Sequence, residues 1–122
     1  MITDGKIKEL VDELLEIDEK CAKAGHEWAQ ANQIAERYEE LKKPLLKQIM
    51  CELRELPVHK KTAHNNLEEI AMSDARYVEW VEDKVVHQRR ANDLKIEQSK
   101  YHNRQKTLIT VISLGKSLMN IR

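Results

Sequence analysis

Residues 7–38 read IKELVDELLEIDEKCAKAGHEWAQANQIAERY, and small or apolar side chains recur along them at alternating intervals of three and four residues. This spacing is a heptad repeat, the pattern by which one long α-helix packs along another. We therefore predict a long helix whose apolar stripe must be covered by a partner helix. The stripe positions are Ile7, Leu10, Leu14, Ile17, Cys21, Ala24, Trp28, Ala31, Ala35 and Tyr38.

A second heptad stripe runs through the C-terminal part of the chain, and its chemistry is mixed. Lys84, His87, Gln98 and Gln105 occupy positions where apolar residues are usual. Polar residues in such a stripe fix register and partner at some cost in stability. The stripe positions are Tyr77, Trp80, Lys84, His87, Ala91, Leu94, Gln98, Tyr101, Gln105, Leu108, Ile112, Gly115 and Met119.

Prolines set the expected limits of the first helix. Thr3 is a plausible N-cap, and we expect the helix to run over residues 4–56. Pro44 lacks an amide donor and disfavours helical dihedrals at Lys43, so we expect a kink or a short break at Pro44. Pro57 ends the helix.

The connection between the two long helices is expected over residues 57–73. Thr62 can cap a short helix there that contains Leu67, Ile70 and Ala71. Ser73 and Asp74 then give a start signal for a second long helix over residues 74–118. The fold class predicted is all-α, a single domain built as a long antiparallel, coiled-coil-like helical hairpin with a short connecting helix.

The composition favours an elongated helical protein that associates with a second copy. The chain has 122 residues, of which 34% are charged and only 4% aromatic, with three Gly and two Pro. A compact globular core would be thin, so we expect a homodimer or higher oligomer to complete it. The flanking apolar residues that we expect a second copy to cover are Val11, Leu15, Leu46, Val81 and Val85.

The chain reads as a soluble, cytoplasmic protein. Residues 1–20 are acidic, so we expect no secretory signal there, and no apolar run approaches the roughly 20 residues that span a bilayer. Cys21 and Cys51 would lie about 45 Å apart along one helix, too far for a disulfide, so we expect free thiols.

The zero net charge conceals an asymmetry. Residues 1–84 carry 13 basic and 19 acidic side chains, a net charge of −6, whereas residues 85–122 carry 8 and 2, a net charge of +6. Opposite charges suit two chain ends lying side by side in a hairpin. Alternatively, the basic end faces a polyanion, and both can hold because a helix has several faces.

Two basic surfaces are candidate binding sites. Arg89, Lys100 and Arg104 are expected together on one face of the second helix, opposite its stripe, and Arg90 flanks them, although Asp93 and Glu97 dilute that face. Such a face suits modest, sequence-independent contact with phosphates, or the rim of an acidic protein partner. The second candidate is the tip of the hairpin, which carries His59, Lys60, Lys61 and His64 on an exposed connection.

The sequence offers no catalytic constellation. It contains no nucleophile elbow, no Gly-rich phosphate loop and no tightly spaced His or Cys pairs of the kind that hold zinc. We therefore expect a non-enzyme with no cofactor, no metal and no small-molecule substrate.

The block from Ser73 to Arg104 resembles small helical accessory proteins of bacteriophages. The residues that carry the resemblance are Ser73-Asp74-Ala75-Arg76-Tyr77, Gln88-Arg89-Arg90-Ala91-Asn92 and Tyr101. The resemblance implies a phage protein that acts in nucleic-acid metabolism or against a host system, without catalytic residues. The function expected is thus a non-catalytic interaction protein, such as an inhibitor or adaptor, that engages nucleic acid or a host protein. The alternative is a purely structural oligomer, such as a scaffold or assembly chaperone.

Overall fold

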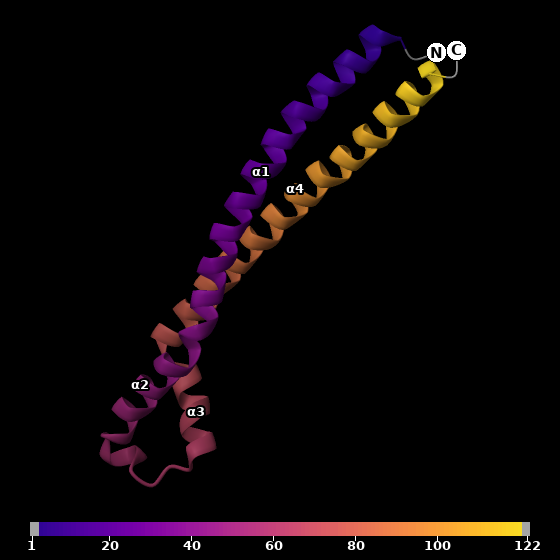
Figure 1. Cartoon of the computed structure of the whole chain (residues 1–122). Coiled ribbons are helices and arrows are strands. Elements are labelled where there is room, and N and C mark those ends of the chain that lie inside the picture. The colour runs from indigo at the N-terminus through magenta and orange to yellow at the C-terminus, as the bar shows by residue number, and fades with distance from the viewer. Residues whose placement is uncertain (1–2, 121–122) are drawn as a thin grey trace. The chain divides into compact units, whose positions relative to one another are not determined.

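The computed structural model describes residues 3–120, and these are all-α, as predicted from the sequence. The elements are α1 (Asp4–Glu40), α2 (Lys42–Arg54), the short 3₁₀ helix η1 (Pro57–His59), α3 (His64–Met72) and α4 (Ala75–Asn120). Figure 1 labels the four α-helices. Two compact units divide the chain: one joins the residues up to 30 to those from 92 onward, and the other is residues 31–91. No described helix combines the length and the apolar character that crossing a membrane requires.

The first unit pairs the N-terminal part of α1 with the C-terminal part of α4. Arg104 contacts Glu13, and a Cβ at Gly25 would meet Gln98, so the residue numbers fall along α4 as they rise along α1, and the two segments are antiparallel. Ala24, Leu108 and Ile112 are buried between them. The remaining stripe positions of this unit are at least half-buried, from Ile7 to Trp28 and from Leu94 to Met119.

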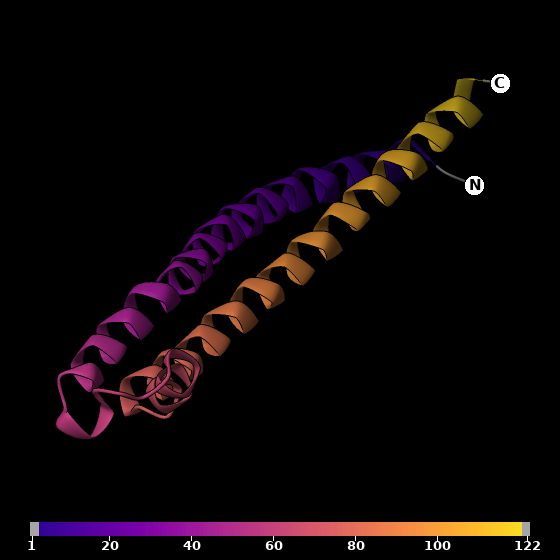
Figure 2. The ribbon, with the colours of Figure 1, turned by 90° about the horizontal axis from the view of Figure 1, so that it is seen from below.

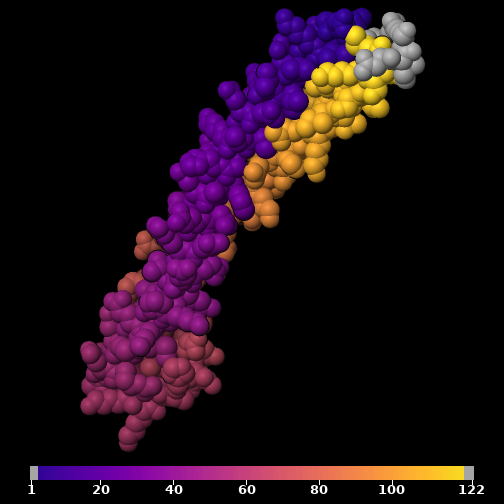
Figure 3. Space-filling view, viewed as in Figure 1, coloured from indigo at the N-terminus to yellow at the C-terminus, as the bar shows by residue number. Residues whose placement is uncertain are grey.

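The second unit contains the end of α1, all of α2, η1 and α3, and the start of α4. Leu46, Ile49 and Ala71 form its core cluster, with Met50 and Tyr77 among the partly buried side chains packed on it. Figure 3 shows atoms of α2 and α3 lying against one another in this unit. The prediction that Leu46 lies on an exposed flank was wrong. Only 7% of this residue is exposed, because α3 packs over that side of α2.

The helix break falls at Leu41, three residues before the proline that causes it. Pro44 has no amide hydrogen, so the carbonyl of Glu40 has no helical donor, and a proline fits best in the first turn of a new helix. α1 therefore ends at Glu40 and α2 starts at Lys42, with Lys43 inside the new helix rather than forced out of it. The Leu41 N–H still bonds to the Arg37 carbonyl at 3.2 Å.

The caps of the shorter elements differ from those expected. α3 begins after Ala63, which makes no side-chain cap, and Thr62 instead contacts His59, with 3.3 Å between Thr62 Oγ1 and His59 Nδ1. Asp74 does cap α4, accepting a 2.9 Å bond from the Arg76 N–H. Thr3 accepts a 3.2 Å bond from the Lys6 N–H at the start of α1. Figure 2 shows the loop that leads from α2 to α3.

Polar residues of the second stripe are accommodated by specific partners on α1. His87 stacks on Tyr38, with ring centroids 4.6 Å apart. Lys84 lies 3.1 Å from a carboxylate oxygen of Glu39 and 5.1 Å from the ring centroid of Trp80. These contacts explain why a lysine and a histidine can occupy stripe positions: each meets a complementary group across the helix pair.

Candidate functional site

The second unit has a groove between α2 and α3. Its volume is about 490 Å³. α2 contributes Lys43, Leu46, Lys47, Met50, Cys51 and Arg54, and α3 contributes His64, Leu67 and Glu68. We call this surface the basic groove.

The floor of the basic groove is apolar. Leu46 and Leu67 are 7% and 2% exposed, and Met50 packs against the core cluster beneath. Cys51 is an exposed free thiol on the same face of α2. Methionine adapts its shape to a bound surface, so this floor suits an apolar ligand face.

The rim of the basic groove carries mainly positive charge. Lys43, Lys47 and Arg54 follow one face of α2 at intervals of four and seven residues, while α3 adds His64 and one acidic side chain, Glu68. Lys43 and Lys47 are exposed, and neither makes an ion pair with another side chain in residues 3–120. Their ammonium groups are therefore available to a partner.

Arg54 organises the tip beside the groove. Its guanidinium donates to the carbonyl oxygens of His59, Lys60 and Thr62 at 3.0, 3.3 and 2.7 Å. Three carbonyls converging on one cation hold the η1 loop in a defined shape. Arg54 is consequently a structural residue more than a free cation.

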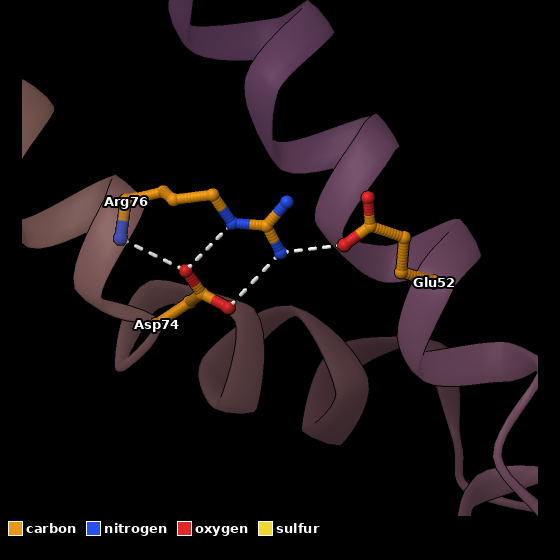
Figure 4. A network of polar contacts seen from close by, with 3 residues as sticks. All are labelled: Glu52, Asp74 and Arg76. Atoms are coloured by element: carbon orange, nitrogen blue, oxygen red, sulfur yellow. Dashed lines mark hydrogen bonds and ion pairs between the residues drawn. The ribbon is translucent and has the colours of Figure 1, made fainter.

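A clamp of charged residues fixes α2 to the start of α4. Figure 4 shows Arg76 lying between Asp74 and Glu52. The guanidinium donates to Glu52 at 2.6 Å and to Asp74 at 3.0 and 3.2 Å. The hydrogen bond from Arg76 lowers the pKa of Glu52, and the side-chain and backbone hydrogen bonds from Arg76 lower the pKa of Asp74. Both carboxylates in turn raise the pKa of Arg76. The clamp supports the wall of the groove.

The residues predicted at the tip lie where the groove and the η1 loop meet. His64 lines the groove, Lys60 and Lys61 are exposed on the loop, and His59 is half-buried against Thr62. Sequence reasoning thus named the loop but not the α2 face beside it. His64 is thus the tip residue that lines the groove, and Arg54, which also lines it, binds carbonyl oxygens of the adjoining loop.

The basic face predicted on α4 is less uniform than expected. Arg89 and Arg90 are exposed in the unit formed by residues 31–91, and Lys100 and Arg104 are exposed in the other unit. Arg104 was expected to point away from the partner helix, and this was wrong. It donates to Glu13 on α1 at 2.6 and 3.0 Å, because its position flanks the stripe.

Sequence reasoning missed Lys43, Lys47, Met50 and Cys51, and a charge count over shorter windows would have found them. Residues 42–64 carry six Lys or Arg against two Glu, a net charge of +4. They lie between two acidic stretches, with net charges of −6 over residues 1–41 and −4 over residues 65–84. Counting over residues 1–84 as one block averaged this local basic segment away.

The described residues, 3–120, hold no group of three or more His, Cys, Asp or Glu side chains arranged for a metal ion.

The chain matches no protein-family model, and no curated protein or solved structure is detectably similar to it.

Proposed function

We propose that this chain is a non-catalytic interaction protein that binds a macromolecular partner through residues 42–68. The observation that carries the proposal is the basic groove: an apolar floor with an available cationic rim, next to a loop of defined shape. Concave apolar surfaces with a few placed charges are typical of binding sites. Loops held by a rigid scaffold commonly take part in recognition.

The groups that line the groove are suited to recognition. Leucine and methionine side chains bury apolar area on binding, and lysine side chains pair with acidic groups. Cys51 and His64 both line the groove, yet no hydrogen bond joins them in residues 3–120. A nucleophile activated by a base needs such a contact, with a third group orienting the base.

The charge of residues 42–64 favours an acidic partner. This segment has a net charge of +4 and lies between two acidic stretches of the chain. A positive surface bordered by negative charge steers and orients an approaching anion. The resemblance to phage accessory proteins implies two acidic partner classes, nucleic acid and a host protein. Capture with and without nuclease treatment separates the two.

A purely structural oligomer is the second candidate, and one observation favours it. Val78, Val81 and Val85 follow one face of α4 at intervals of three and four residues and are 45%, 36% and 45% exposed. A second copy could cover such an apolar stripe. In that case the groove would have no external partner.

Capture from host lysate tests the proposal when two charge-matched variants are compared. The first replaces Lys43, Lys47, Lys60 and Lys61 with Glu; the control replaces Arg89, Arg90, Lys100 and Lys106 with Glu. We expect the wild type and the control to recover the same partner and the first variant to lose it. Loss in the control alone would move the site to α4. Recovery that nuclease treatment abolishes would identify nucleic acid.

A further inference from the structure

We propose that the basic groove receives an acidic, amphipathic helical segment of a partner protein. This inference rests on the proposed function and specifies the partner's chemistry. The proposal commits to a helix that lies along α2, with its apolar face on the floor and its carboxylates toward the α2 rim.

The length of the groove fits about three turns of helix. Lys43 and Arg54 are 11 residues apart on α2, and at about 1.5 Å rise per residue the rim extends about 16 Å. A helical ligand presents apolar anchors at i, i+3, i+4 and i+7 over a comparable length. Leu46, Met50 and Leu67 provide the complementary floor.

Charge on the two walls differs, and this difference orients the ligand. The α2 wall carries Lys43 and Lys47, whereas the α3 wall carries Glu68 beside His64. Carboxylates along one flank of the ligand would meet the two ammonium groups, while the opposite flank must avoid acidic residues because Glu68 would repel them. The groove therefore selects a helix acidic on one flank over one that is acidic all round.

Nucleic acid fits the same surface less well. Arg54 already donates from its Nη1 nitrogen to three main-chain carbonyl oxygens. Among the described residues, no Phe, Tyr or Trp lines the groove to stack on a base, and His64 supplies its single ring. The buried leucines of the floor offer nothing to a phosphate backbone but match the apolar face of a helix.

Binding can be followed at Cys51, which is exposed and lies in the groove. In a Cys21→Ala chain, Cys51 is the single thiol, and its rate of alkylation by N-ethylmaleimide reports whether the groove is occupied. The probe ligand is a 15-residue helical peptide with Leu at positions 3, 6, 7 and 10 and Glu along one flank. Its control has the same composition in an order that destroys the amphipathic pattern.

We expect the amphipathic peptide to slow alkylation of Cys51 and to bind at least about tenfold more tightly than its control. Lys43→Glu/Lys47→Glu should weaken peptide binding by about tenfold or more, and Arg89→Glu/Arg90→Glu, an equal charge change on α4 outside the groove lining, by much less. A peptide with Lys in place of Glu should prefer the Lys43→Glu/Lys47→Glu chain over the wild type. Circular dichroism confirms that each variant is folded.

Several results would overturn the inference. Equal binding of both peptides, equal loss in both double variants, or binding that leaves the alkylation rate unchanged would each exclude a helix in this groove. A DNA duplex that protects Cys51 and displaces the peptide would assign the groove to nucleic acid. Protection that rises with protein concentration alone would assign it to a second copy. If capture of a partner still depends on Lys43 and Lys47 while the peptide fails, the proposed function stands and only its helical ligand is wrong.

Discussion

The indole of Trp80 donates a 2.8 Å hydrogen bond from Nε1 to the main-chain carbonyl oxygen of Tyr38, 42 residues away in the sequence. This carbonyl belongs to the last turn of α1, where helical acceptors lose their own donors. It is also 3.3 Å from the Leu41 nitrogen, at the break before α2. Trp80 therefore holds in place the point where the chain changes from α1 to α2.

Replacing Trp80 with Phe should destabilise the protein by about 1–2 kcal/mol, because the carbonyl of Tyr38 loses its best donor in a buried site. Urea unfolding followed by circular dichroism measures the change. Trp28→Phe is the matched control, since Trp28 is half-buried and its indole makes no hydrogen bond to any residue in 3–120. Equal losses in the two variants would show that the hydrogen bond contributes little.

The Arg76 clamp should make stability depend on acid. Glu52 and Asp74 have lowered pKa values in the folded chain. Their contribution to the free energy of unfolding is therefore complete above their ordinary pKa values near 4, and it is lost as the pH falls through the lowered pKa values. Arg76→Gln should therefore lower the urea midpoint at pH 7 and have a smaller effect at pH 3.

The control for the clamp is Arg89→Gln, which removes an exposed arginine from the same helix. The urea midpoints of the two variants should differ most at neutral pH and low salt, because salt screens exposed ion pairs. An Arg76→Gln effect that is constant from pH 7 to pH 3 would rule out ionic stabilisation by this clamp.

The helical architecture was readable from the sequence because heptad spacing is a direct geometric signal. Every stripe residue is buried or half-buried, including polar ones such as His87 and Gln98. The stripe does not reveal which groups neighbour a flanking residue. The contact between Arg104 and Glu13 depends on how the two helices are placed side by side, and one helical wheel cannot show it.

The groove was missed for a related reason. Leu46 continues the apolar pattern of the first helix, so its burial by α3 could not be seen without knowing that the connection folds back on α2. The break at Leu41 turns α2 into a separate helix with its own faces. Because α2 is a separate helix against which α3 packs, Lys43 and Lys47 form one wall of the groove.

Gly25 and Gln98 should be energetically coupled. A Cβ at Gly25 would lie 2.6 Å from Gln98 Nε2, so the flexible amide must move when Gly25 becomes Ala. Alanine gains about 1 kcal/mol of helix propensity over glycine, and we expect the displaced amide to cancel much of this gain. In a Gln98→Ala background, Gly25→Ala should be more favourable by about 0.5–1 kcal/mol. A double-mutant cycle in urea measures the difference, and strict additivity would contradict the contact.

Ile49 should be among the most sensitive positions in residues 31–91. It is fully buried in the cluster with Leu46 and Ala71, and Ile49→Ala should cost about 2–5 kcal/mol through lost burial and the cavity left behind. Leu15→Ala is the control, because Leu15 is 60% exposed and should change stability by less than about 0.5 kcal/mol. Thermal unfolding of the two variants compares them, and a small effect at Ile49 would mean that this cluster does not anchor the unit.

Self-association should depend on the apolar stripe of α4. We expect the chain to sediment as a dimer or larger species at micromolar concentration, and Val81→Lys/Val85→Lys to shift it toward monomer. Both valines are partly exposed, so the fold should tolerate the change. A wild-type monomer in sedimentation velocity would remove the structural oligomer from consideration.

Hydrogen exchange on the complex with a captured partner tests the central claim most directly. If residues 42–68 are the binding surface, protection gained on binding should concentrate in α2, η1 and the first turn of α3, with little change at Arg89 and Arg90 on α4. Protection confined to α4, with residues 42–68 exchanging as in the free chain, would contradict the account.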